Sequence, residues 1–187
     1  MVNSAEIFPK VLELDRAEWV WRELWTLAAA EDATDETVRL AAMIGITRLT
    51  EARRGELANL RVGDVDLKGG HVTVRRTKFQ QIHTLPLDPD LQRVLETWTK
   101  RRERLVQRHI EGGKHDALLV TCHHTTWTTQ ARRPATKQIG LPLSPQGVLL
   151  AWKRWSRQAN AHYLGQIEGW KPLPQRFESI RMAWRRH

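Results

Sequence analysis

Residues 71–75 alternate between polar and apolar side chains, and the hairpin that they begin constrains the fold more than any other feature of the chain. In the segment 71–75, HVTVR, every second residue is a valine, which is the period of a strand with one buried face. A Gly-Gly pair supplies a turn before it, and a second strand is predicted from Ile82 to Leu87. The two strands predict an antiparallel hairpin with Lys78 near its tip.

Much of the remaining sequence follows the period of an amphipathic helix. Asp15 and Asp35 are each predicted to cap a helix, and the pairs Asp88-Pro89 and Ser144-Pro145 place a proline in a first helical turn. The apolar residues at helical spacing behind these start signals are predicted to face the core. They are Val20, Trp21, Leu24, Trp25, Leu27, Val38, Ala41, Ala42, Leu91, Val94, Leu95, Trp98, Val148, Trp152, Trp155 and Ala159.

The rest of the pattern sets the fold class. Gly45 is a weak point in the second predicted helix, because glycine disfavours a helix interior. Residues 112–143 are predicted to form a loop, apart from the apolar residues 118–120. At 187 residues the chain is long enough for one domain with its own core. The sequence therefore predicts a single α+β domain, mainly helical, with a small antiparallel sheet that carries the Lys78 hairpin.

The stretch TEARRGEL, residues 50–57, is a candidate phosphate-binding element. Arg53 and Glu56 stand three residues apart, so on a helix their side chains share a face and can interact. A guanidinium recognises phosphate through two parallel hydrogen bonds, and a nearby carboxylate can orient it or accept a proton. The alternative interpretation is an exposed ion pair that contributes little.

Positive charge is concentrated in the second part of the chain. Residues 1–70 carry 9 Lys and Arg against 13 Asp and Glu, whereas residues 71–187 carry 21 against 8, so the net charge of +9 hides a basic portion of +13. Such a portion favours a sequence-independent grip on a phosphate backbone, although a basic run can also be the solvated face of a helix. The candidate DNA-contacting side chains are Arg54, Arg75, Arg76, Lys153, Arg154 and Arg157.

The order of these elements resembles the tyrosine recombinase family, the phage integrases. TEARRGEL is similar to the family's T-G-L-R-x-x-E-L box, with Glu51 in place of the glycine, and the run from Lys78 to Leu87 is similar to its lysine hairpin. The segment FESIR, which ends at Arg181, is similar to the His-x-x-Arg box, with Glu178 in place of the histidine. The resemblance extends over most of the chain and implies an integrase-type catalytic domain.

The resemblance also implies a reaction and a partner. In that reaction a tyrosine attacks a phosphodiester of double-stranded DNA, without a metal or another cofactor. Arg53 and Arg181 are then expected to hold the non-bridging oxygens, and Lys78 to protonate the leaving 5′-oxygen. Glu56 is expected to orient the arginine box, and Glu178 to occupy the histidine position. The function implied is site-specific DNA recombination and integration.

The nucleophile of that reaction has no counterpart in the sequence. Tyr163 is the one tyrosine and precedes Arg181, whereas the family's nucleophile follows this arginine; its predicted role is a ring packed against a helix. The hypothesis is a catalytic domain over residues 1–187 that binds DNA, is incomplete before its tyrosine and lacks the N-terminal core-binding domain. The alternative is a non-catalytic DNA-binding or regulatory module on the integrase scaffold.

The sequence further predicts a location and an assembly state. Cys122 is the single cysteine, which excludes an internal disulfide and suits a reducing compartment. No apolar run is long enough to cross a membrane, so a cytoplasmic, nucleoid-associated protein of bacterial or phage origin is expected. The adjacent His123 and His124 are a weak metal signal, and no metal site is predicted. A monomer is expected, with an oligomer forming on DNA only if the missing C-terminal segment were present.

Overall fold

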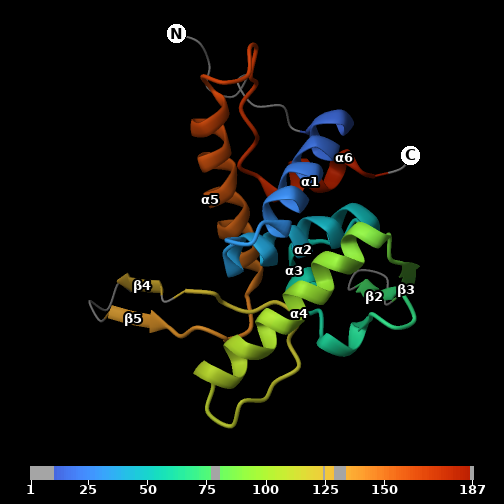
Figure 1. Ribbon diagram of the computed structural model, residues 1–187, viewed down its shortest axis with the longest axis vertical. Coiled ribbons are helices and arrows are strands. Elements are labelled where there is room, and N and C mark those ends of the chain that lie inside the picture. The colour runs from blue at the N-terminus through green and yellow to red at the C-terminus, as the bar shows by residue number, and fades with distance from the viewer. Residues whose placement is uncertain (1–10, 77–80, 124, 129–133, 186–187) are drawn as a thin grey trace.

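The computed structural model describes residues 11–76, 81–123, 125–128 and 134–185, and helices form the body of this part of the chain (Figure 1). The helices are α1 (Leu14–Ala29), α2 (Asp35–Thr50), α3 (Arg54–Ala58), the 3-10 helix η1 (Val62–Asp64), α4 (Pro89–His109), α5 (Pro145–Tyr163) and α6 (Phe177–Ala183). The strands are β1 (Val65–Asp66), β2 (His71–Arg76), β3 (Gln81–Pro86), β4 (Thr125–Thr128) and β5 (Pro134–Lys137). The predicted class, α+β and mainly helical, is confirmed. Among the described helices, none has the length and apolar character needed to span a membrane.

Helix α2 lies in the core because nearly all of its faces are covered. Every residue from 38 to 47 is buried, and α1 and α4 both pack on it. Gly45 permits this close approach, since a Cβ atom there would lie 2.5 Å from Cδ1 of Leu91 and 2.7 Å from Cζ3 of Trp21. The glycine that weakens the helix by propensity is therefore required by its packing.

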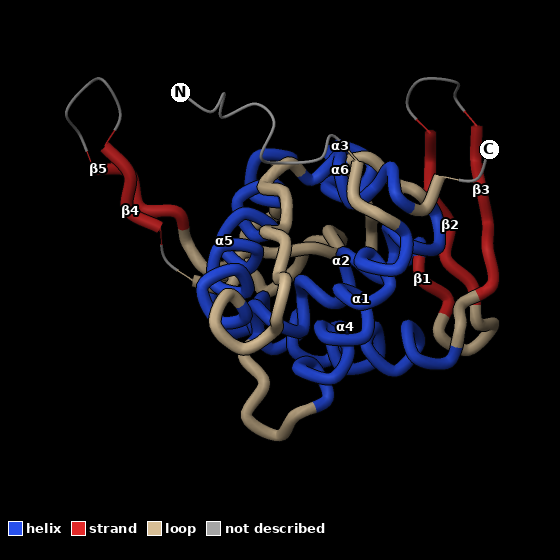
Figure 2. Tube along the Cα trace, turned by 90° about the horizontal axis from the view of Figure 1, so that it is seen from above, coloured by secondary structure: helices blue, strands red, loops and turns tan. Residues whose placement is uncertain are grey.

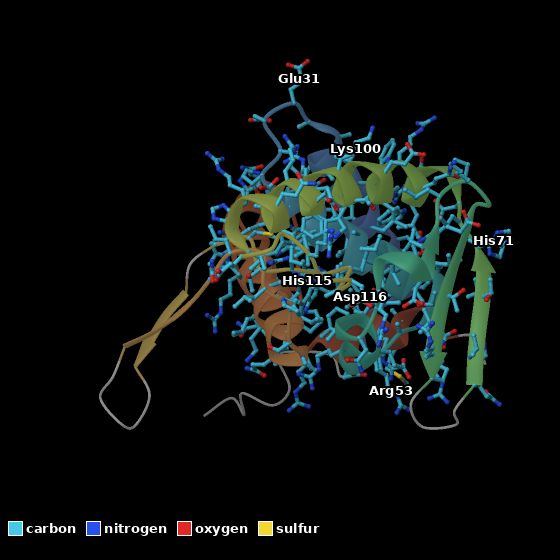
Figure 3. The ribbon with its side chains drawn as sticks, turned by 90° about the horizontal axis from the view of Figure 1, so that it is seen from below. Glu31, Arg53, His71, Lys100, His115 and Asp116 are labelled. Carbon is cyan, nitrogen blue, oxygen red and sulfur yellow. The ribbon has the colours of Figure 1, made fainter. Side chains whose placement is uncertain are left out.

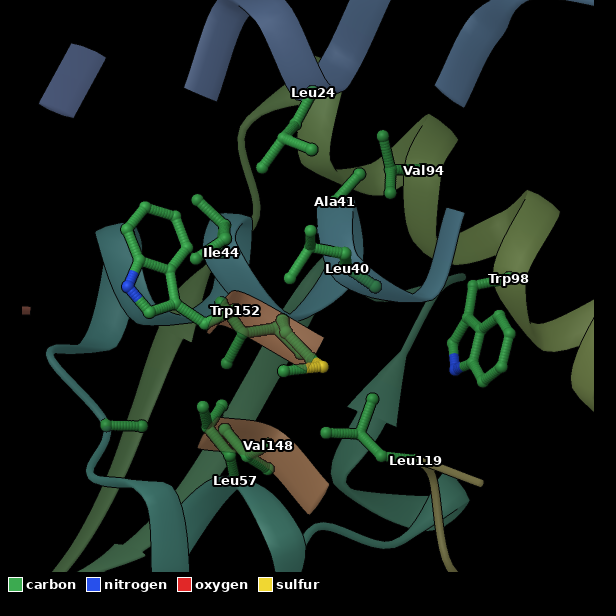
Figure 4. Packing of buried hydrophobic residues seen from close by; sticks show 14 of the residues in the cluster. Leu24, Leu40, Ala41, Ile44, Leu57, Val94, Trp98, Leu119, Val148 and Trp152 are labelled. Atoms are coloured by element: carbon green, nitrogen blue, oxygen red, sulfur yellow. The ribbon is translucent and has the colours of Figure 1, made fainter. Parts of the chain in front are cut away.

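The predicted apolar stripes form the core that these helices share. Figure 4 shows Leu24 of α1, Ala41 of α2 and Val94 of α4 near one another, with Trp152 of α5 in the same cluster. Trp25 and Trp155, which were predicted to face the core, are half-buried and pack against this cluster. Leu27 is the exception: its residue is 41% exposed, because the buried stripe of α1 continues through the neighbouring alanine in the last turn.

The helix starts confirm two of the predicted caps and correct two. The side chains of Asp88 and Ser144 each accept a hydrogen bond from the backbone N–H three residues on, at 2.9 and 3.1 Å. For α2 the cap is Thr34, whose hydroxyl accepts from a backbone N–H at 3.2 Å, and Asp35 follows it as the first helical residue. Asp15 likewise lies inside α1. Both aspartates stand in a first turn, where the helix dipole favours a carboxylate.

The predicted hairpin is present as β2 and β3. The strand β1 pairs with the other edge of β2, so the sheet has the antiparallel order β1-β2-β3. Val72 and Val74 are buried, as the alternation predicts, and Val72 lies opposite Leu85. Ile82 of the second strand is 67% exposed, and β3 forms one edge of the sheet. Lys78 lies outside the described residues.

The segment predicted to be a loop contains a second hairpin, β4 with β5. The two strands pair antiparallel, with Thr125 opposite Lys137. The prediction was wrong because the threonines of this segment are β-branched and favour strands, and because Pro134 stands at the first position of a strand, where no ladder bond is lost. Figure 2 shows this hairpin projecting from the flank of the helical body opposite the three-stranded sheet.

Candidate functional site

The C-terminal end of α2 joins three parts of the chain through its carbonyl groups. Glu51, which follows the helix, has a left-handed backbone with a φ of 56°. Its carbonyl oxygen accepts from Nη1 of Arg76 at 3.2 Å and from Nη1 of Arg181 at 3.5 Å. Arg76 also donates to the carbonyl of Thr50. Because unpaired carbonyls at a helix end favour cations, this turn fixes both β2 and α6 against α2.

Replacing Glu51 with glycine is expected to raise the free energy of unfolding by about 1 kcal/mol. The left-handed region disfavours a residue with a side chain by about 1–2 kcal/mol, and glycine loses part of this gain through the greater freedom of its unfolded chain. Urea unfolding followed by tryptophan fluorescence measures the difference. Glu51→Ala is the control, since it removes the carboxylate but keeps a Cβ atom; an equal gain in both variants would assign the effect to charge instead.

Arg53 and Glu56 lie together, but their side chains do not form the predicted pair. Arg53 precedes α3 in an extended backbone conformation, and its backbone N–H donates to Oε2 of Glu56 at 2.8 Å. The same oxygen pairs with Nη1 of Arg76 at 3.0 Å, and the residue Glu56 is only 4% exposed. Among the described residues the Arg53 guanidinium has no hydrogen bond or ion pair, and its side chain is exposed. The carboxylate thus holds the backbone of Arg53 in place and leaves its guanidinium free for a ligand.

Arg181 carries its own counterion. Its Nε donates to Oε2 of Glu178 at 2.6 Å, one helical turn earlier on α6. The side chain of Arg181 is 13% exposed and that of Glu178 is 45% exposed, so the carboxylate lies on the solvent side of the pair. A phosphate that approaches Arg181 therefore meets a guanidinium whose Nε edge is already occupied.

These groups surround one polar pocket of about 230 Å³, which we name the phosphate pocket after the ligand predicted for it. It is lined by Glu51, Arg53, Glu56, Arg76, Gln81, His83, Arg181 and Arg185. Figure 3 shows Arg53 on the side of the molecule where the hairpin strands end. The four arginines exceed the two glutamates by two positive charges, and Glu178 offsets one of them. The remaining single charge matches that of one phosphodiester. The structure therefore brings Arg53, Glu56 and Arg181 together, as predicted, while Lys78 lies outside the described residues.

Four lining residues were not predicted as site residues, namely Glu51, Gln81, His83 and Arg185. Gln81 and His83 are separated by one residue of β3, so the strand period indicates that they share a face. That face is turned toward Arg53 by the packing of β2 on α3 and of β3 on α2, which no local pattern reveals.

The predicted DNA-contacting residues are distributed over two regions. Arg76 lies inside the pocket, where its contacts to a buried carboxylate and to carbonyls hold the fold together. Arg54 begins α3, and Arg75 pairs with Asp64 at 2.5 Å. The remaining residues lie on α5 and do not line the pocket; there Arg154 pairs with Glu36 at 2.7 Å, Arg157 donates to Gln175 at 3.3 Å and Lys153 is half-buried.

Tyr163 has the packing role that was predicted for it. Its ring meets that of Trp19 edge-on, with centroids 5.1 Å apart, and its hydroxyl donates to Glu23. Burial and the neighbouring carboxylate raise the pKa of Tyr163 to about 12. Tyr163 does not line the phosphate pocket, and a phenol with a raised pKa is a poor source of a phenolate nucleophile.

The cysteine and histidines that follow residue 121 show no metal arrangement in the described ranges. Burial raises the pKa of the Cys122 thiol to about 11, which disfavours the thiolate that binds metals. His123 lies against Glu36, and His124 is outside the described residues. Across the described part of the chain no three His, Cys, Asp or Glu side chains cluster as metal ligands.

Comparisons with known proteins agree with this arrangement. The model of the Phage integrase family matches residues 22–184. The uncharacterized protein y4gA of Sinorhizobium fredii (strain NBRC 101917 / NGR234) is 60% identical over 91 residues, which make up 48% of this chain and 42% of that protein.

Two solved structures share the fold. The XerA recombinase has a TM-score of 0.56 at 18% identity, covering 95% of this chain and 49% of that one. The Tn1549 transposon integrase in complex with transposon right end DNA has a TM-score of 0.53 at 16% identity, covering 98% and 54%. The chain thus spans about half the length of these solved relatives. Because the family model covers most of the chain, this protein belongs to the phage integrase family.

Proposed function

We propose that this chain binds the phosphodiester backbone of double-stranded DNA and takes part in site-specific recombination of the tyrosine recombinase type. The observation that carries the proposal is the pocket that Arg53 and Arg181 line together, in which the Arg53 guanidinium has no partner among the described residues. Family membership supports it, as does the Tn1549 integrase, which was solved in complex with transposon right end DNA. The basic portion of the chain provides a surrounding field that attracts a polyanion.

The proposed roles follow from the contacts of each side chain. Arg53 donates to one non-bridging oxygen and Arg181 donates to the other, while Glu178 accepts from the Nε of Arg181. Glu56 keeps both the Arg53 backbone and Arg76 in place, so it acts as a positioning residue. Lys78, at the predicted hairpin tip, is proposed to protonate the leaving 5′-oxygen. Tyr163 is not assigned as the nucleophile, since its hydroxyl donates to Glu23 and does not line the pocket.

Arg53→Ala is expected to weaken the binding of a DNA duplex by about tenfold or more. A hydrogen bond between charged groups contributes about 1.5–3 kcal/mol, and the Arg53 guanidinium makes no contact among the described residues that its loss would disturb. The slope of log affinity against log salt concentration is expected to fall by about 1. Fluorescence anisotropy of a labelled duplex at several salt concentrations measures both quantities.

The matched control is Arg22→Ala, which removes the same charge from an exposed position on α1 outside the pocket. We expect this control to lower the affinity by less than about threefold, because a remote surface charge acts only through the screened field. An Arg53→Ala variant with unchanged affinity and reduced stability would contradict the proposal and favour a structural role for Arg53.

A further inference from the structure

A second cavity, of about 140 Å³, lies between α2, the beginning of α5 and the segment that leads into β4. It shares no lining residue with the phosphate pocket. Leu143, Leu150 and Ala151 provide a largely apolar wall, and Arg39 and Arg154 supply the charged groups. A small apolar cavity with a few polar groups that converge on it is the usual form of a small-molecule site.

Arg39 is the unusual member of this lining. The residue is only 3% exposed, yet it lines both this cavity and a neighbouring one of about 260 Å³ between α2 and α5. Its Nη1 donates to the carbonyl of Val120 at 2.8 Å, while its buried Nε has no hydrogen-bond partner among the described residues. Buried donors are nearly always paired, so the unpaired Nε of a guanidinium whose residue lines two cavities indicates a missing acceptor.

The neighbouring carboxylates do not neutralise Arg39, because other cations already hold them. Glu36 pairs with Arg154 at 2.7 Å and lies against His123, and the next carboxylate, Asp35, pairs with Arg101 at 3.1 Å. Burial lowers the pKa of His123, although Glu36 acts in the opposite direction. Nη2 of Arg154 lies 3.1 Å from Nε2 of His123, and since a guanidinium only donates, this ring nitrogen is unprotonated. One positive charge, that of Arg39, is left over.

We propose that this cavity binds a small organic monoanion, a carboxylate on an apolar body of about the size of benzene. A planar carboxylate matches the donor fork of a guanidinium and supplies the acceptor that Arg39 lacks. The volume is close to that of cavities that hold benzene, about 150 Å³. Leu143, Leu150 and Ala151 contact the apolar body. Inorganic phosphate fits less well, because it offers no apolar surface to these walls.

Benzoate is the probe that tests the site. We expect the full chain to bind benzoate saturably in isothermal titration calorimetry, with a Kd of about 1 mM or lower. Benzamide has the same shape without the charge and is expected to bind at least about tenfold more weakly. Inorganic phosphate is expected to show no saturable binding at the same concentrations.

Two variants test whether benzoate binds in this cavity. Arg39→Met retains an apolar stem of similar length, and it is expected to remove the preference for benzoate over benzamide. Ala151→Leu fills the cavity while Arg39 stays in place, and it is expected to abolish the binding of both ligands even if Arg39→Met does not fold. Circular dichroism confirms that each tested variant is folded. None of these experiments measures DNA affinity, so a failure to bind benzoate would leave the proposed function unaffected.

Three results would overturn the proposal. The first is the absence of saturable benzoate binding to the unmodified chain. The second is equal affinity for benzoate and benzamide, which would show that the Arg39 charge takes no part. The third is a dimer in light scattering that dissociates when Arg39 is replaced, because a carboxylate from a second copy of the chain would then occupy the site.

Discussion

Replacing Glu56 with alanine is expected to lower the free energy of unfolding by about 3–5 kcal/mol, because the partly buried guanidinium of Arg76 loses its counterion. Glu56 is 4% exposed, and its Oε2 accepts both from Nη1 of Arg76 at 3.0 Å and from the backbone N–H of Arg53 at 2.8 Å. The Arg76 side chain is 20% exposed and cannot turn into solvent without releasing the carbonyls of Thr50 and Glu51. Urea unfolding monitored by circular dichroism measures the loss.

A surface pair of nearly the same length provides the control. Arg61 and Asp116 are 3.1 Å apart, but their side chains are 64% and 66% exposed, so Asp116→Ala is expected to change stability by less than about 1 kcal/mol. The two pairs differ chiefly in burial. Similar losses in Glu56→Ala and Asp116→Ala would contradict the claim that Glu56 organises the pocket through a buried contact.

The motif residues of the phosphate pocket were predictable, whereas their pairing and the other half of the lining were not. TEARRGEL and FESIR identify Arg53, Glu56 and Arg181 because short motifs keep their spacing in the chain. The ion pair of Glu56 joins it to Arg76, twenty residues away, and the turn at Glu51 meets Arg181, which is 130 residues away. A period within one helix could only suggest Arg53 as the partner of Glu56. Sequence periodicity indicates which residues share a face, but not which distant element packs on it.

The fold shows the same division between local and distant information. Helix starts with an Asp-Pro or Ser-Pro pair were predicted correctly, because the cap bond and the proline both act within one turn. The hairpin β4–β5 was missed because threonine-rich segments suit both loops and strands, and strand pairing across residues 125–137 decides between them. The packing role of Gly45 depends on α1 and α4, which meet it from other parts of the chain.

Trp98→Ala is expected to destabilise the protein by about 3–5 kcal/mol, because it empties a large site in the core. Trp98 is fully buried on α4, and its Nε1 donates to the carbonyl of Leu118 at 3.0 Å (Figure 4). The segment 118–120 runs through the core between Leu60 and Leu143, with backbone bonds of 2.8 and 2.9 Å to those residues. Loss of the indole therefore removes apolar contacts and also leaves a buried carbonyl without its donor. Thermal and urea unfolding measure the effect.

Trp98→Phe separates these two contributions, since phenylalanine keeps an aromatic ring but cannot donate. We expect Trp98→Phe to lose less than half as much stability as Trp98→Ala, about 1–2 kcal/mol, because of the unpaired Leu118 carbonyl and the smaller ring. Trp25→Ala, at a half-buried position on α1, is expected to have a smaller effect than Trp98→Ala. Equal losses in Trp25→Ala and Trp98→Ala would contradict this account. They would show that the anchoring of segment 118–120 by α4 contributes little to the fold.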